Sequence, residues 1–90
     1  MESFKLHLLR LAREGRVEVP GLPVRAYTLA IEASQGEERQ GQGFYLVLEG
    51  ELVIDLPGGR YLHLKRGEAA RVTEPHRLVP VERAVVLEVG

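Results

Sequence analysis

Residues that could carry chemistry occur in two short segments, "GEERQGQGFYLVLEG" at positions 36–50 and "TEPHRLV" at positions 73–79. In the first segment, Arg39 could receive a carboxylate or a phosphate through its bidentate guanidinium group. In the second, His76 could hydrogen-bond a small polar ligand or act as a general base. Each residue also has a structural interpretation: Arg39 as half of a solvated loop ion pair with a neighbouring glutamate, and His76 as a turn residue.

Other arrangements that support catalysis or phosphate binding are missing from the sequence. Ser3 and Ser34 are the only serines, and neither lies in a G-x-S-x-G elbow. There is no cysteine, which excludes thiolate catalysis and cysteine zinc sites. The glycines of segment 36–50 lack the G-x4-G-K-[ST] order of a phosphate-binding loop. We therefore expect neither a hydrolase triad nor a nucleotide site.

Length and composition indicate one small domain spanning residues 1–90. Twelve Lys and Arg residues nearly balance 13 Asp and Glu residues and are scattered, so nucleic-acid binding is not expected. No apolar run reaches the roughly 18 residues of a membrane span, and the first residues lack the pattern of a signal peptide. A cytoplasmic protein is the expectation. The abundance of arginine and the absence of asparagine would suit a thermophilic source.

The elements that must position these residues are one helix and a series of short strands. Ser3 can cap a helix over residues 3–14, with Gly15 as its stop. From residue 16 the apolar period becomes two, and turn signals recur, among them 34–43 and 49–50. The expected strands are 24–33, 44–49, 51–56, 61–65, 68–72, 76–79 and 84–89. This pattern predicts an all-β sandwich or barrel over residues 16–90.

Two of these strands are apolar on both faces. Segment 51–56 alternates cleanly, with Leu52, Ile54 and Leu56 facing inward, whereas segments 44–48 and 84–89 need a cover on each side. The N-terminal helix or a second subunit must supply the outer cover, and we therefore expect a homodimer. Pro80 cannot donate to a ladder and should lie at an edge or a bend.

The segment from residue 36 to about residue 89 resembles the cupin family. The pieces that carry the resemblance follow in the family's order: the strand "LVLEGEL" at 46–52, the "PGG" hairpin at 57–59, the "LKRGE" turn at 64–68 and Pro75-His76. This resemblance implies a small double-stranded β-helix, also called a jelly-roll barrel, which is frequently dimeric.

Metal-binding cupins resemble one another in a pattern of three histidines and one glutamate, from which this sequence departs. The first two histidine positions hold either Glu37 and Arg39 or Gly36 and Glu38, depending on the gap length, and the glutamate position holds Gly43. Arg39 is a fixed cation that would repel a metal. We therefore expect no metal cofactor.

One histidine of the family pattern survives if two residues have been lost from the turn before it, and this is His76. A metal site would also need His63, which shares the presumed wet face with Tyr61 and Lys65. We expect His63 and His7 to be surface residues.

We predict that Glu37, Arg39, Tyr45 and His76 line the mouth of the barrel. Three functions remain open for such a mouth. The domain could bind a small polar or anionic molecule without a metal or serve as a dimeric interaction module, or it could be a purely structural homodimer partner whose barrel is filled by its own side chains. The alternative is a metal-dependent enzyme of the isomerase or dioxygenase type, with an unusual ligand set that includes His76.

Overall fold

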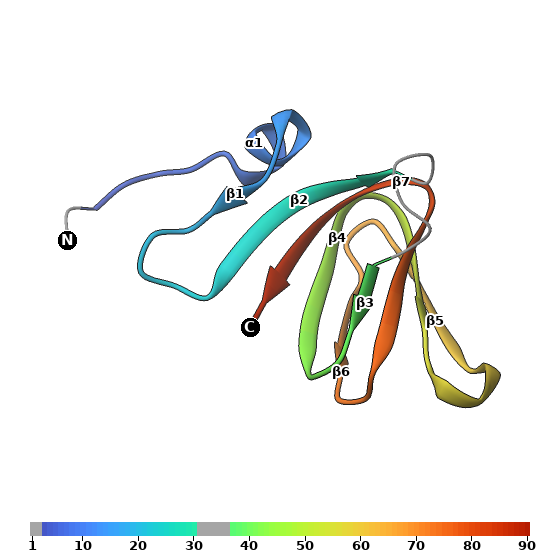
Figure 1. The fold of residues 1–90 in the computed structure, drawn as a ribbon. Helices are drawn as coiled ribbons and strands as arrows, with labels where there is room; N and C mark the ends of the chain where they lie inside the picture. Colours follow the sequence, from blue (N-terminus) through green and yellow to red (C-terminus); the bar gives the residue numbers. More distant parts are fainter. Residues whose placement is uncertain (1–2, 31–36) are drawn as a thin grey trace.

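The computed structural model describes residues 3–30 and 37–90, which form antiparallel strands and one short helix (Figure 1). In chain order the elements are α1 (Leu8–Glu14), β1 (Val17–Glu18), β2 (Val24–Ala30), β3 (Glu37–Arg39), β4 (Gly43–Asp55), β5 (Tyr61–Lys65), β6 (Ala69–Val72) and β7 (His76–Val89). A 3₁₀ turn, Pro57–Gly59, joins β4 to β5. The predicted all-β class with a short N-terminal helix is confirmed.

The strands form two facing layers because β4 and β7 each run through both of them. The end of β7 pairs with β2 and its beginning pairs with β3, while the beginning of β4 pairs with β6 and its end pairs with β5. One layer therefore contains β2, the end of β7, the beginning of β4 and β6. The other contains β3, the beginning of β7, the end of β4 and β5. Figure 1 shows the two long strands curving from one layer into the other.

Gly50 lies at the bend of β4, where the sequence predicted a turn between two strands. The chain does not reverse there; β4 continues, and its register with β7 shifts on both sides of Gly50. Gly50 has a φ of 79°, and a Cβ at this position would lie 2.1 Å from the carbonyl oxygen of Arg83. Glycine is thus required at position 50 by an irregularity in the β4–β7 ladder and not by a hairpin turn.

Strand β7 also joins two segments that were predicted separately. Pro80 lies opposite Leu52, next to the register shift, in the stretch of β7 that neither β2 nor β3 pairs with. The expectation that Pro80 lies at an edge or a bend is confirmed.

The loop predicted over residues 34–43 contains a strand. Residues 37–39 pair with residues 76–78 of β7, which brings Arg39 opposite His76. Backbone hydrogen bonds to the edge of β7 can form whether the side chains are polar or apolar. Residues 37–39 therefore form a strand although their composition is typical of a loop.

Helix α1 is shorter than the predicted helix over residues 3–14, and Ser3 is not its cap. His7 caps it: its Nδ1 accepts a hydrogen bond from the backbone N–H of Arg10 at 3.2 Å. Residues 3–7 are exposed and lead away from the body of the molecule (Figure 1). A short helix is stable mainly where its apolar face packs, and this accounts for its late start. No helix among the described residues is long and apolar enough to span a membrane.

The core lies between the two layers, and a smaller cluster lies outside them. The inner cluster comprises Tyr27, Leu29, Tyr45, Val47, Leu52, Ile54, Leu64, Val72, Leu78, Ala84 and Val86. Outside, α1 places Ala12 on Ala26 and Val85, and the hydroxyl of Thr28 donates to the carbonyl oxygen of Ala12. The helix therefore supplies part of the outer cover that the two-faced strands need.

Replacement by alanine should destabilise the protein to different extents at Gly50, in the bend of β4, and at Gly58, although the two glycines have nearly the same φ. Gly50→Ala should lower the free energy of unfolding by about 3 kcal/mol, because backbone strain adds to the overlap with Arg83. Gly58, with a φ of 78° and nothing within 4 Å of an added Cβ, is the matched control, and its replacement by Ala should cost about 1 kcal/mol. Urea unfolding measures both, and equal losses would contradict a close contact at Gly50.

Candidate functional site

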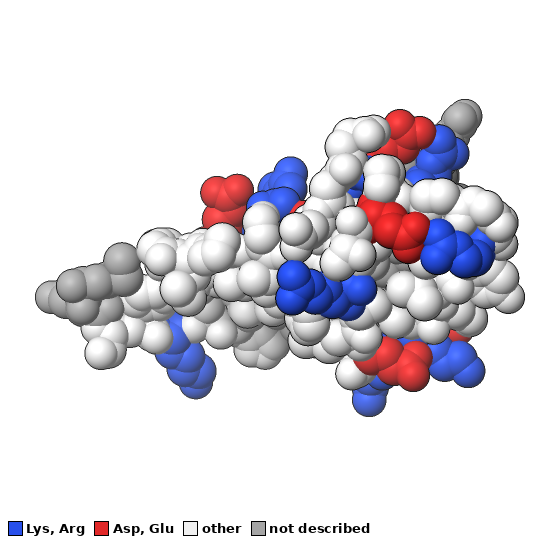
Figure 2. All heavy atoms as spheres, turned by 90° about the horizontal axis from the view of Figure 1, so that it is seen from below, with Lys and Arg blue, Asp and Glu red and all other residues white. Residues whose placement is uncertain are grey.

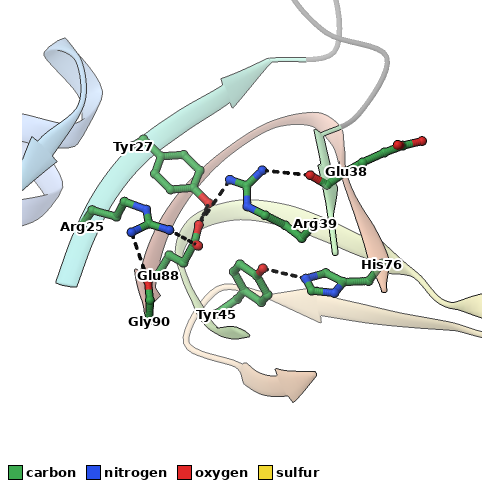
Figure 3. Close-up of polar contacts among 8 residues, drawn as sticks. All are labelled: Arg25, Tyr27, Glu38, Arg39, Tyr45, His76, Glu88 and Gly90. Atoms are coloured by element: carbon green, nitrogen blue, oxygen red, sulfur yellow. Dashed lines mark hydrogen bonds and ion pairs between the residues drawn. The ribbon is translucent and has the colours of Figure 1, made fainter. Parts of the chain in front are cut away.

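Three of the four predicted mouth residues converge inside the barrel. Arg39 extends from β3, Tyr45 from β4 and His76 from the start of β7, and all three point toward one polar cluster (Figure 3). The backbone of Glu37 is part of β3, while its side chain lies outside the described part of the structure.

Tyr45 and His76 form a buried hydrogen-bonded pair. The Tyr45 hydroxyl lies 2.6 Å from Nε2 of His76, and the two side chains are 0 % and 6 % exposed. Nδ1 of His76 lies 2.7 Å from the carbonyl oxygen of Glu74, which can only accept. We therefore assign the proton of the neutral ring to Nδ1, so that Nε2 accepts the Tyr45 hydroxyl. Both ring nitrogens are engaged inside the protein.

Glu88 is the residue that the sequence prediction missed. It lies on the inner face of β7, opposite Arg25 on β2 and Tyr45 on β4, and is only 4 % exposed. Its carboxylate accepts hydrogen bonds from the Tyr27 hydroxyl at 2.5 Å and from the Arg25 guanidinium, and it pairs with Arg39 at 3.4 Å. The signal was available in segment 84–89, where Glu88 shares one face with Ala84 and Val86 and is the one residue that is not apolar.

The Glu88 carboxyl is ionised at neutral pH. Burial alone would raise its pKa, but the Tyr27 hydrogen bond and the charges of Arg39 and Arg25 outweigh burial, and its pKa lies below the usual value. Two guanidinium groups, those of Arg25 and Arg39, thus pair with this one carboxylate. Nε of Arg25 is buried and donates to none of the described atoms.

Arg39 connects this interior cluster to the surface. Its side chain is 25 % exposed and lines, with His76, a pocket of about 250 Å³ at the mouth. The other lining residues are Glu38, Gln40, Asp55, Pro75 and Arg77. Of the two glutamates that could form a loop ion pair with Arg39, Glu38 directs its carboxylate to Arg77, and its backbone oxygen accepts a hydrogen bond from Nη1 of Arg39 at 3.4 Å. The side chain of the other, Glu37, lies outside the described part of the structure.

The two remaining histidines lie outside this cluster, as predicted. His63 is 40 % exposed and its Nε2 lies 3.1 Å from the Glu51 carboxylate, while its neighbour Tyr61 is 65 % exposed. His7 is exposed at the start of α1.

The side chains of the cluster do not fit a divalent metal. His76 has no free ring nitrogen, and Arg39 brings a positive charge to a position that the metal-binding pattern described above gives, with one of its two gap lengths, to a histidine. A Cβ on Gly43, the glutamate position of the family pattern, would lie 2.6–2.9 Å from the Tyr45 ring, which fills that space. Within residues 3–30 and 37–90 no three His, Asp or Glu side chains gather in a way that could hold a metal.

The Glu88 cluster predicts a specific dependence of stability on pH. A carboxyl with a lowered pKa stabilises the fold above its unfolded-state value, near 4.5, and this contribution is lost as the pH falls below it. Glu88→Gln should therefore cost about 3 kcal/mol at neutral pH, because it leaves two buried cations with less compensation, and the gap to wild type should close in acid.

Chemical unfolding between neutral and acidic pH measures this difference. Glu49→Gln is the matched control, since Glu49 pairs with Arg13 on the exposed surface, and it should change stability little. A gap between wild type and Glu88→Gln that stays constant with pH would contradict an ionised, ion-paired Glu88.

Comparisons with known proteins match this chain by structure and not by sequence. No protein-family model and no curated protein matches the sequence. Protein NMB1881 from Neisseria meningitidis superposes with a TM-score of 0.71 at 15 % identity, covering 97 % of this chain and 100 % of its own. A cupin-2 domain protein from Shewanella frigidimarina gives a TM-score of 0.65 at 15 % identity, covering 82 % of this chain and 74 % of its own.

A third match, the Fe(II) form of HppE, has a TM-score of 0.62 at 21 % identity. It covers 78 % of this chain but only 42 % of the longer HppE chain. At these identities the likeness concerns the fold. The two bent layers, the β4–β7 ladder and these matches agree that the chain is a small domain with the cupin fold.

Proposed function

We propose that this domain binds a small anionic molecule at the barrel mouth and does so without a metal. The observation that carries the proposal is Arg39, which lines a surface pocket and whose guanidinium pairs with the buried carboxylate of Glu88. A guanidinium presents paired donors to a carboxylate or a phosphate, so this geometry suits an acid group.

The cost of the buried cluster supports a binding role. A 90-residue chain has a small stability margin, and buried ion pairs rarely stabilise a fold more than apolar side chains of the same volume. Glu88, Tyr45 and His76 nevertheless occupy the inner faces of the barrel strands. Ionisable groups arranged in this way concentrate at functional sites.

The rim of the pocket indicates a small polar acid as the ligand. Gln40 and Asp55 line the same pocket, and their side-chain oxygens suit hydroxyl or ammonium groups of the ligand. A volume of about 250 Å³ limits the ligand to a few non-hydrogen atoms beyond its acid group. Nucleic acid is a poor candidate, because Figure 2 shows blue and red side chains intermingled on the face it presents.

The metal-dependent enzyme is the less favoured function, because Tyr45 and the Glu74 carbonyl occupy both ring nitrogens of His76. Metal analysis of protein purified without a histidine tag addresses this point. Stoichiometric Fe, Mn, Ni or Zn that disappears in His76→Ala would overturn the metal-free proposal.

A second function, homodimerisation, is favoured by apolar residues that nothing in the described chain covers. Phe4 is 52 % exposed and Leu6 is 37 % exposed on the segment that leads away from the body. On the outer face, Val89 pairs with Phe44, which is 39 % exposed, beyond the reach of the α1 cluster. Figure 2 shows few charged side chains on the narrow end near the N-terminus. We propose that a second copy covers these residues.

The anion site makes a prediction for Arg39. Acetate, lactate, glycine and inorganic phosphate serve as probes in NMR titrations of backbone amides near Arg39 and His76. Arg39→Gln should weaken binding of the tightest probe by at least about tenfold, because it loses a charge-assisted pair, and Arg39→Lys should retain part of the affinity. Arg13→Gln, on the outside of the molecule, should bind as wild type does. Equal affinity for wild type and Arg39→Gln would refute the site.

The dimer makes a separate prediction. Light scattering at micromolar concentration should give twice the 10.0 kDa mass of the chain, and Phe4→Ser combined with Leu6→Ser should shift the protein toward monomer. Tyr61→Ser removes a still more exposed aromatic residue on β5 and should leave the mass unchanged. A wild-type monomer at these concentrations would rule out the dimer.

A further inference from the structure

Arg39 belongs to two sites at once. It lines the mouth pocket, and its Nη2 lies 3.4 Å from a Glu88 oxygen. Glu88 itself does not line the pocket. An anion that enters the pocket and pairs with Arg39 must therefore share one guanidinium with the buried carboxylate behind it.

The Glu88 carboxylate is held in place by hydrogen bonds from β2. Arg25 holds one of its oxygens, and the Tyr27 hydroxyl donates to the other, the oxygen that also faces Arg39. Both partners lie on β2, which pairs with β7 in full register from Val24 to Ala30. The carboxylate is thus a fixed negative charge, and in a partly dry interior its field reaches the pocket with less screening than in water.

We propose that Glu88 acts as a charge filter: it weakens the binding of every anion that pairs with Arg39, and it weakens the binding of a dianion more than that of a monoanion. This inference rests on the proposed anion site. The Coulomb energy between Glu88 and the ligand grows in proportion to the ligand's charge, so Glu88 opposes a dianion about twice as strongly as a monoanion.

The experiment compares acetate and malonate, which carry the same acid group with one or two charges near neutral pH. NMR titrations at constant ionic strength give the dissociation constants for wild type, Glu88→Gln and the surface control Glu49→Gln. Glu88→Gln should bind acetate about fivefold more tightly and malonate about 25-fold more tightly, because the gain in free energy doubles with the charge. Glu49→Gln should match wild type for both probes.

Tyr27→Phe provides a second variant that keeps the charge of Glu88. It removes the hydroxyl that shares the Glu88 oxygen with Arg39, so the carboxylate should draw more on Arg39. Both probes should then bind more weakly, and malonate should lose more than acetate. The two variants therefore shift affinity in opposite directions, and Tyr27→Phe decides the matter if Glu88→Gln fails to fold.

Two results would overturn the inference, and they differ from failure of the anion site itself. If wild type binds acetate and Arg39→Gln does not, but Glu88→Gln or Tyr27→Phe leaves the ratio of the two affinities unchanged, the charge filter is wrong and the anion site stands. If neither wild type nor Arg39→Gln binds acetate or malonate, the proposed anion site is wrong, and the proposed role of Glu88 is then wrong as well.

Discussion

The ladder between β4 and β7 is the constraint on which the rest of the structure depends. These strands pair from Phe44–Val89 at one end to Asp55–Arg77 at the other, and the pairing crosses from one layer of the barrel into the next. Every other strand except β1 pairs with one of these two. The irregularity at Gly50 lets the ladder bend while it keeps its inward and outward faces on both sides. Tyr45, His76 and Glu88 meet inside the barrel because all three lie on this pair.

The interior is a polar cluster built into an otherwise apolar core. Leu52, Ile54 and Leu78 fill the space between the layers as in an ordinary sandwich, whereas the region around Glu88 and His76 is hydrogen-bonded. Low dielectric strengthens a satisfied network and penalises an unsatisfied one, so such a cluster fixes one arrangement of side chains. The side chains of Arg25 and Arg39 are each about one quarter exposed, so the cluster reaches the surface through its guanidinium groups.

The cupin fold accommodates this chemistry as readily as it accommodates a metal. HppE, which shares the fold, was crystallised in Fe(II) and Co(II) forms. In this chain the Tyr45 ring takes the volume next to Gly43, and a guanidinium extends from β3. A scaffold defines where side chains converge, and the side chains define the function.

The sequence by itself determined the class of the fold and the strand faces. Alternation over residues 51–56 and the two-faced apolar strands are local properties that survive folding, and Arg39, Tyr45 and His76 were found from their types and positions. Only the tertiary structure decided that Gly50 bends a strand, that residues 37–39 pair with β7, that α1 starts at Leu8, and that Glu88 is the partner of Arg39. These features depend on contacts between segments that are far apart in the chain, and Arg39 and Glu88, for example, are separated by 49 residues. Such contacts supply a strand to pair with, a surface to pack on or an opposite charge. The local sequence pattern leaves several conformations open for these residues and does not specify the contacts.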